Sequence, residues 1–127
     1  MSKRLIFKKK LPYNYNNILD LYDCSGVYVF FKKSGIPIYV GMARSQSIKR
    51  RIMRYMKFHE NHNTLLASYI RSSKFSIYFS IICIKKSDEI REIESFLIKR
   101  FQPICNNDRD KKRRLISNRF LNYKVVI

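Results

Sequence analysis

The stretch Gly26–Gly41, GVYVFFKKSGIPIYVG, holds two β-prone runs separated by a short segment that contains a Ser-Gly pair. Valine, isoleucine, tyrosine and phenylalanine on either side of such a pair are typical of a β-hairpin. Each run also carries a tyrosine close to a glycine, Tyr28 in the first run and Tyr39 in the second. Because tyrosine is favoured in strands, these two tyrosines with their nearby glycines indicate, by themselves, no more than packing within the hairpin.

A helix is predicted after this hairpin, beginning near Ser47, whose hydroxyl can cap it. Four residues at helical spacing form its apolar stripe: Ile48, Ile52, Tyr55 and Met56. Arg51 lies at the edge of that stripe, whereas Lys49, Arg50 and Arg54 project elsewhere. An arginine among apolar neighbours needs a partner, because an unpaired buried charge is costly.

Two elements are expected next, a short helix over Asn63–Ser72 and a third strand over Lys74–Ile84. The helix would face inward with its apolar residues Leu65, Tyr69 and Ile70. In the strand, every second residue from 75 to 83 is apolar, and the opposite face mixes serine with larger apolar residues. One buried face and one largely covered face indicate a central strand.

Ser87 is expected to cap a further helix that ends before Pro103. Its buried stripe is formed by Ile90, Ile93, Leu97 and Phe101. Glu94 falls inside this stripe, four residues after Ile90 and three before Leu97. A buried carboxylate must be paired or protonated, so Glu94 needs a cation, either an arginine or a metal ion.

The composition indicates a strongly basic globular protein: 27 Lys and Arg stand against 9 Asp and Glu among 127 residues, and the net charge is +18. Such a charge favours a polyanion, most often nucleic acid, with an acidic protein or an anionic membrane surface as weaker alternatives. The longest apolar run, Phe75–Ile84, has about half the length that a membrane helix needs. With no secretory signal found, we expect a cytoplasmic protein that does not bind membranes.

The three cysteines, Cys24, Cys83 and Cys105, lie far apart and show no Cys-x-x-Cys spacing. We therefore expect small buried side chains rather than a disulfide or a zinc site. One helical turn is expected over Asn17–Tyr22. Partial helical spacing near the C-terminus predicts a short helix formed by Leu115, Ile116, Phe120 and Leu121.

In combination, these motifs resemble the GIY-YIG nuclease family. The resemblance rests on Gly26-Val27-Tyr28, Tyr39-Val40-Gly41, an arginine on the next helix, and a glutamate followed at family spacing by Pro103 and Asn106. The nearest likeness is to the N-terminal nuclease domain of the bacterial excision-repair endonuclease and its stand-alone relatives. It covers residues 24–107 of one domain spanning 1–127, with basic extensions at 1–23 and 108–127. The family fold implies an α/β (α+β) domain in which helices flank a small three-stranded, mainly antiparallel sheet.

The resemblance also implies catalytic roles. Glu94 would be the single protein ligand of one divalent ion, Mg²⁺ or Mn²⁺, and Arg51 would hold the scissile phosphate. Tyr28 and Tyr39 would enter the same cleft, where one of them orients or deprotonates the attacking water, and which one is the base stays open. The set is completed by Tyr55, which would assist the phosphate or the water, and by Asn106, which would hold the active-site backbone.

Contacts to nucleic acid are expected from one glycine and from basic residues: Gly41, Arg44, Lys49, Arg50, Arg54, Lys111, Lys112, Arg113 and Arg114. Gly41 would let backbone and substrate approach closely. Many relatives carry a lysine where this chain has Met42, so Arg44 is the expected replacement. His59 and His62 lie where some relatives have a catalytic histidine, although an ordinary surface role is favoured for both.

The favoured function is therefore a metal-dependent endonuclease that acts on DNA rather than RNA, as a monomer or homodimer, with weak or structure-guided specificity. A catalytically silent nucleic-acid-binding module is one alternative. A restriction-type or effector nuclease with an acidic protein partner is another. Arg51 and Glu94 favour the enzyme, unless the two residues merely form a buried ion pair that ties two helices together.

Overall fold

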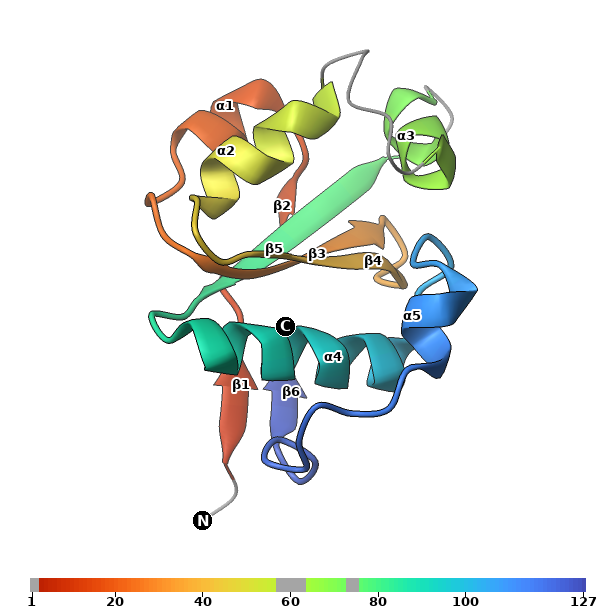
Figure 1. The fold of residues 1–127 in the computed structure, drawn as a ribbon. Helices are drawn as coiled ribbons and strands as arrows, with labels where there is room; N and C mark the ends of the chain where they lie inside the picture. The colour runs from red at the N-terminus through yellow and green to blue at the C-terminus, as the bar shows by residue number, and fades with distance from the viewer. Residues whose placement is uncertain (1–2, 57–63, 73–75) are drawn as a thin grey trace.

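The computed structural model describes residues 3–56, 64–72 and 76–127, which form an antiparallel sheet with helices on both faces (Figure 1). The sheet order is β2, β5, β3, β4, with the bounds Leu11–Pro12, Ile77–Cys83, Gly26–Lys32 and Pro37–Ala43. This arrangement confirms the expected class. The predicted count of three strands is wrong, because β2 of the N-terminal extension pairs with β5 and adds a fourth strand.

The predicted hairpin is formed by β3 and β4, and its register places Tyr28 opposite Gly41 and Phe30 opposite Tyr39. Gly35 closes the turn with a φ of 95°, a conformation that favours glycine. Strand β3 pairs with β4 on one side and β5 on the other, and it is buried along almost its whole length because its alternate side chains enter core clusters on both faces of the sheet. The expectation that β5 is an inner strand is also confirmed, which leaves β4 at one edge of the sheet.

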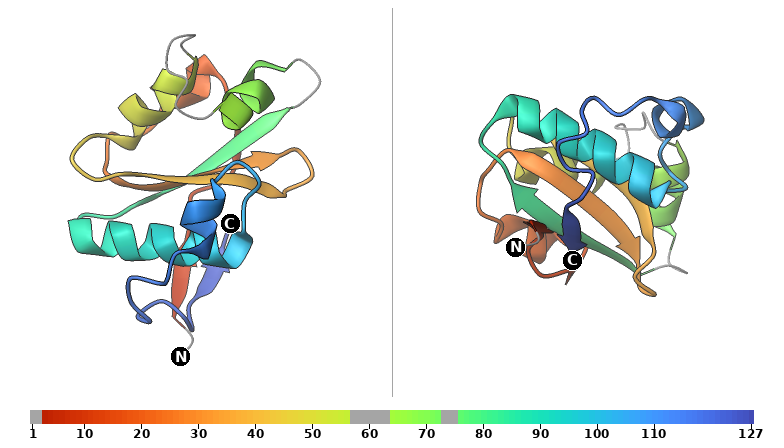
Figure 2. Two further views of the ribbon diagram at one scale, coloured as in Figure 1. Left: turned by 45° about the vertical axis from the view of Figure 1, so that its right-hand side comes forward. Right: turned by 90° about the horizontal axis from the view of Figure 1, so that it is seen from below.

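Helices cover the two faces of the sheet unequally (Figures 1 and 2). One face carries α1 (Tyr15–Leu19), α2 (Ile48–Met53) with its 3₁₀ extension η1 (Arg54–Met56), and α3 (Thr64–Arg71), and the other carries α4 (Ser87–Phe101). Alternation along β3 divides the core accordingly: Tyr28 and Phe30 pack towards α2, whereas Val27 and Val29 pack towards α4.

The two chain ends complete the core beside α4. Strand β1 (Arg4–Ile6) pairs in parallel with β6 (Lys124–Val126), and the buried Leu5, Phe7 and Phe120 join the cluster beneath the sheet. The helix predicted around 115–121 is wrong. A helix instead spans Asp108–Lys112 (α5), and the later segment is tied to α4 through Arg119, 2.7 Å from Glu89.

The predicted helix caps and helix positions agree with the structure in part. Ser47 does cap α2, since its side chain accepts a hydrogen bond from the backbone N–H of Arg50 at 3.0 Å. Ser87, in contrast, is the first residue of α4 and makes no capping bond; it accepts one from Arg44 instead, at 2.8 Å. In α3, Tyr69 and Ile70 are partly buried against the core as expected, and Leu66 is fully buried, whereas Leu65 is 43% exposed. The N-terminal turn lies at Tyr15–Leu19, slightly earlier than expected.

The cysteine prediction is wrong for two residues, because Cys24 and Cys83 form a disulfide across 59 residues of sequence. The register explains the pairing: Gly26 lies opposite Cys83, so the residue that shortly precedes β3 reaches the end of β5. Cys105 is buried as expected, and burial raises the pKa of its thiol to about 11. His59, His62, Lys74 and Phe75 lie outside the described residues. Within the described part of the chain, every helix is too short or too polar to span a membrane.

Candidate active site

A cleft of about 640 Å³ lies at the sheet edge formed by β4, and four of the six predicted catalytic side chains line it. Tyr28 comes from β3, Tyr39 from β4, Arg51 from α2 and Glu94 from α4. Because α2 and α4 cover opposite faces of the sheet, Arg51 and Glu94 can meet in one cleft only beyond the edge strand. The position of β4 at the edge is therefore what allows the site to form.

Tyr28 is fully buried, and its ring lies directly over Gly41 on the neighbouring strand. A Cβ atom at position 41 would overlap the ring carbons and the hydroxyl of Tyr28. Gly41 is itself buried, and the side chain that lies against its backbone is that of Tyr28. The missing side chain lets the phenol cross the edge strand, where its hydroxyl shares a 2.8 Å hydrogen bond with the hydroxyl of Tyr55.

The hydroxyls of Tyr28 and Tyr39 are protonated at neutral pH. Burial raises the pKa of Tyr28 and Tyr39 well above 10, and the nearby Tyr55 raises both further. Arg51 opposes the shift in each case but does not reverse it. In this state Tyr28 and Tyr39 can donate hydrogen bonds to a water or a phosphate oxygen.

Arg51 is half-buried and faces this tyrosine group. Burial alone would lower the pKa of its guanidinium, but Tyr28, Tyr55 and Tyr39 raise that pKa above its ordinary value. No ion pair joins Arg51 to Glu94 in the described part of the chain, so the two residues do not tie α2 to α4. The guanidinium retains donors that can bind a phosphate.

Glu94 is half-buried on α4 between Ile93 and Leu97 and opens into the cleft. Its pKa rises to about 7, chiefly through burial and secondly through Asp110, while Arg113, Arg51 and Arg91 act in the opposite direction. Among the described residues, none donates a hydrogen bond to this carboxylate or forms an ion pair with it.

An open carboxylate of this kind fits a hard divalent cation whose remaining ligands are water and phosphate oxygens. The described residues contain no group of three or more potential metal ligands, so most ligands of an ion at Glu94 would be water and phosphate oxygens.

Asn106 lies behind the cleft rather than in it. Its side chain accepts a hydrogen bond from the N–H of Val40 at 2.9 Å and donates one to the carbonyl of Val40 at 3.0 Å. The backbone N–H of Cys105 adds a bond to the carbonyl of Ile38 at 2.8 Å. Asn106 therefore acts like one residue of an additional strand. It satisfies the backbone N–H and carbonyl of Val40 on the outer edge of β4, between Tyr39 and Gly41.

The predicted nucleic-acid contacts fall into separate groups. Arg44 lines the catalytic cleft. Three residues of the α2 region, Lys49, Arg50 and Arg54, line a different hollow of about 500 Å³. The C-terminal set is Lys111, Lys112, Arg113 and Arg114, of which Lys111 lies 3.6 Å from Asp108 and Arg113 lies 3.2 Å from Asp110.

Tyr13 is a supporting residue that the sequence reasoning missed. Its hydroxyl donates a hydrogen bond to the carbonyl of Ile52 at 2.5 Å, and its ring packs edge-on against Phe30 and Phe79. It thereby fixes α2, which carries Arg51, onto the sheet. The residue lies in the N-terminal extension, where no motif marked it.

Comparison with known proteins agrees with this geometry. The family described as the UvrC-like GIY-YIG domain matches residues 24–107. UvrABC system protein C of Dictyoglomus thermophilum is 34% identical over 84 residues, which are 66% of this chain but only 13% of that protein.

Solved structures show the same likeness. The chain is similar to the GIY-YIG N-terminal endonuclease domain of UvrC from Thermotoga maritima bound to magnesium, its catalytic divalent cation, with a TM-score of 0.56 and 25% identity. That match covers 72% of this chain and 93% of the other. A tyrosine-to-phenylalanine mutant of the same domain matches with a TM-score of 0.56, 24% identity and coverage of 72% and 92%, a likeness that shows the fold alone.

Proposed function

Because the chain belongs to the UvrC-like GIY-YIG domain family, we propose that it is a divalent-metal-dependent endonuclease that hydrolyses phosphodiester bonds in DNA. The observation that carries the proposal is the convergence of Tyr28, Tyr39, Arg51 and Glu94 from four elements at one sheet edge. Magnesium is the catalytic cation of the Thermotoga domain, which favours Mg²⁺ as the ion used here.

The side chains divide the chemistry between them. Arg51 binds the oxygens of the scissile phosphate and opposes the charge that builds up on them during attack. Tyr28 and Tyr39 orient the attacking water and a phosphate oxygen through their hydroxyl protons, and Tyr55 fixes the hydroxyl of Tyr28. A divalent ion held by Glu94 would withdraw charge from the phosphate and lower the pKa of bound water.

Substrate binding is proposed to depend on charge. With a net charge of +18, the chain would bind the phosphate backbone of DNA largely regardless of sequence, so the specificity is weak or guided by DNA structure. One chain supplies the complete set of cleft residues, so a monomer suffices to cut one strand.

The test is cleavage of supercoiled plasmid by the purified chain with Mg²⁺ or Mn²⁺, in parallel with EDTA. Glu94→Gln keeps the shape of the side chain and removes the charge, and Asp88→Asn makes the same change at an exposed position of α4. We expect metal-dependent nicking by the wild type and by Asp88→Asn, with a loss of at least about a hundredfold in Glu94→Gln.

Equal nicking by Glu94→Gln and the wild type would contradict the role of Glu94. Retained DNA binding without any nicking by the wild type would replace the enzyme with a silent binding module.

A further inference from the structure

A second hollow, of about 480 Å³, continues from the catalytic cleft along α4. The two spaces share Met42, Arg44 and Glu94, so they form one continuous depression. The far wall is formed by Arg91 of α4 and by Arg113 near the end of α5. Arg113 lies beyond the residues 24–107 that match the family, so the part of the wall that it forms belongs to the chain's C-terminal extension.

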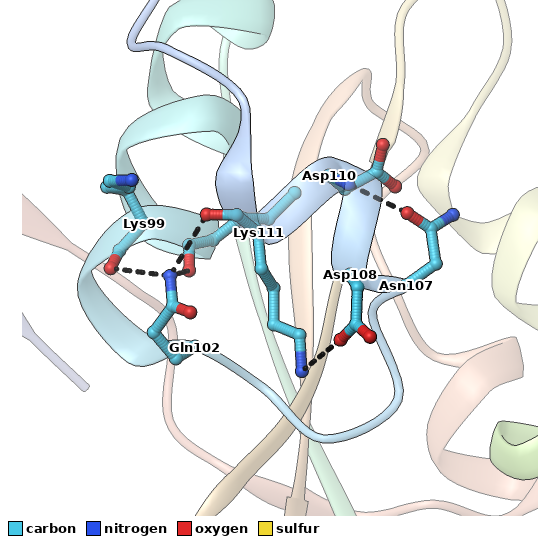
Figure 3. A network of polar contacts seen from close by, with 7 residues as sticks. Lys99, Gln102, Asn107, Asp108, Asp110 and Lys111 are labelled. Atoms are coloured by element: carbon cyan, nitrogen blue, oxygen red, sulfur yellow. Dashed lines mark hydrogen bonds and ion pairs between the residues drawn. The ribbon is translucent and has the colours of Figure 1, made fainter.

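Specific contacts hold α5, which precedes Arg113, against the end of α4 (Figure 3). Gln102 ends α4 in a left-handed conformation with a φ of 46°, and its side-chain amide donates hydrogen bonds to the carbonyls of Lys99 and Lys111, at 3.2 and 3.3 Å. Asn107 caps α5 by accepting a 2.7 Å hydrogen bond from the N–H of Asp110. These bonds fix the position from which Arg113 reaches the hollow.

The charges of the hollow suit a phosphodiester chain. Three arginines line it, Arg44, Arg91 and Arg113, against the two carboxylates of Glu94 and Asp110. The guanidinium of Arg113 lies 3.2 Å from the carboxylate of Asp110, and because both side chains are partly exposed this pair stabilises the fold little. A phosphate oxygen can take the place of the carboxylate, with the bidentate geometry that arginine favours.

We propose that this hollow binds the backbone of the substrate strand next to the cleaved bond, with Arg113 exchanging Asp110 for a phosphate. The apolar side chains of Ile98 and Ile116 line the same space and would contact the sugar. The inference rests on the proposed function, because it takes the adjoining cleft as the place of cleavage.

The first test compares Arg113→Gln with Arg109→Gln, an equal loss of charge at an exposed residue of α5 that does not line the hollow. DNA binding is measured by fluorescence anisotropy in EDTA, between about 50 and 200 mM salt. The quantity compared is the slope of the logarithm of the binding constant against the logarithm of the salt concentration. We expect Arg113→Gln to reduce the magnitude of this slope by about one and Arg109→Gln to leave it unchanged. Asp110→Asn, which releases Arg113, should tighten binding. Equal effects of the two arginine variants would overturn the proposal.

The second test locates the contact on the strand. A methylphosphonate, which removes one phosphate charge, is placed on either side of the cleaved bond. On one side it should weaken binding by the wild type severalfold and have no further effect on Arg113→Gln. Additive losses at every position would contradict the proposal.

The two proposals fail in distinguishable ways. If the wild type binds DNA but does not nick it, the proposed function fails, while the anisotropy result still decides whether DNA occupies the hollow. If cleavage is intact but Arg113→Gln behaves like Arg109→Gln, only the hollow is refuted.

Discussion

The two walls of the catalytic cleft differ in whether their polar side chains are bonded within the protein. On the wall of β3, β4 and α2, buried polar groups are bonded within the protein: Tyr28 to Tyr55, and Asn106 to Val40. On the wall of α4, Glu94 has no hydrogen-bond donor among the described residues, and the neighbouring pair of Arg113 and Asp110 is partly exposed. One wall is thus fixed before any ligand arrives, whereas the other presents charges that a cation and a phosphate can satisfy.

Gly41→Ala should have the largest effect, because it disrupts the internally bonded wall. The new methyl group overlaps the ring of Tyr28, and the buried strands cannot move aside. We expect a loss of about 3 kcal/mol in the free energy of unfolding, together with the loss of nicking. Urea denaturation measures the stability. The control, Ile36→Ala, alters an exposed residue of the same hairpin and should change stability little. A fully stable, active Gly41→Ala protein would contradict the packing of Tyr28 over the edge strand.

Glu94→Gln tests the wall formed by α4 through the pH dependence of protein stability. The pKa of Glu94 is about 7 in the folded chain, above its ordinary 4.5, so folding favours the protonated form. The stability of the metal-free wild type therefore falls as the pH rises from 4.5 through about 7, by at most about 3 kcal/mol. Glutamine stays neutral and avoids that loss.

In EDTA, Glu94→Gln should thus melt above the wild type at about pH 8 and level with it below about pH 4.5. Asp88→Asn should show no such crossing. A variant less stable than the wild type at the higher pH would mean that Glu94 is held by protein partners after all.

Tyr55→Phe should have the smallest effect on stability, because it removes one hydrogen bond and retains the ring. We expect a loss of about 1 kcal/mol in unfolding free energy and a roughly tenfold slower cleavage, since the hydroxyl of Tyr28 is no longer held. Thermal melts and single-turnover cleavage measure the two effects. Tyr15→Phe, at an exposed tyrosine of α1, provides the matched control. Unchanged cleavage by Tyr55→Phe would show that catalysis does not require the hydroxyl of Tyr55 to hold that of Tyr28.

The site was more predictable than the rest of the fold. The glutamate within an apolar stripe and the arginine at the edge of another are local patterns, and the structure places Glu94 and Arg51 in one cleft. The extensions carried no such pattern. The spacing of apolar residues predicts a C-terminal helix near 115–121, but the helix forms at Asp108–Lys112, where Asn107 supplies a cap. Spacing of apolar residues alone did not reveal that cap.

The hairpin, the helix capped by Ser47 and the stripe that contains Glu94 are predictable from the sequence, because strand propensity, capping and helical periodicity act between residues close in the chain. The contacts between distant segments become visible in the folded chain alone. These include the Cys24–Cys83 disulfide across 59 residues, the bond of Asn106 to Val40 across 66, the pairing of the chain ends as β1 and β6, and the hollow that Arg113 shares with Glu94. Such contacts depend on how sheet edges and helix ends meet in space, and that meeting leaves no periodic signal in the chain.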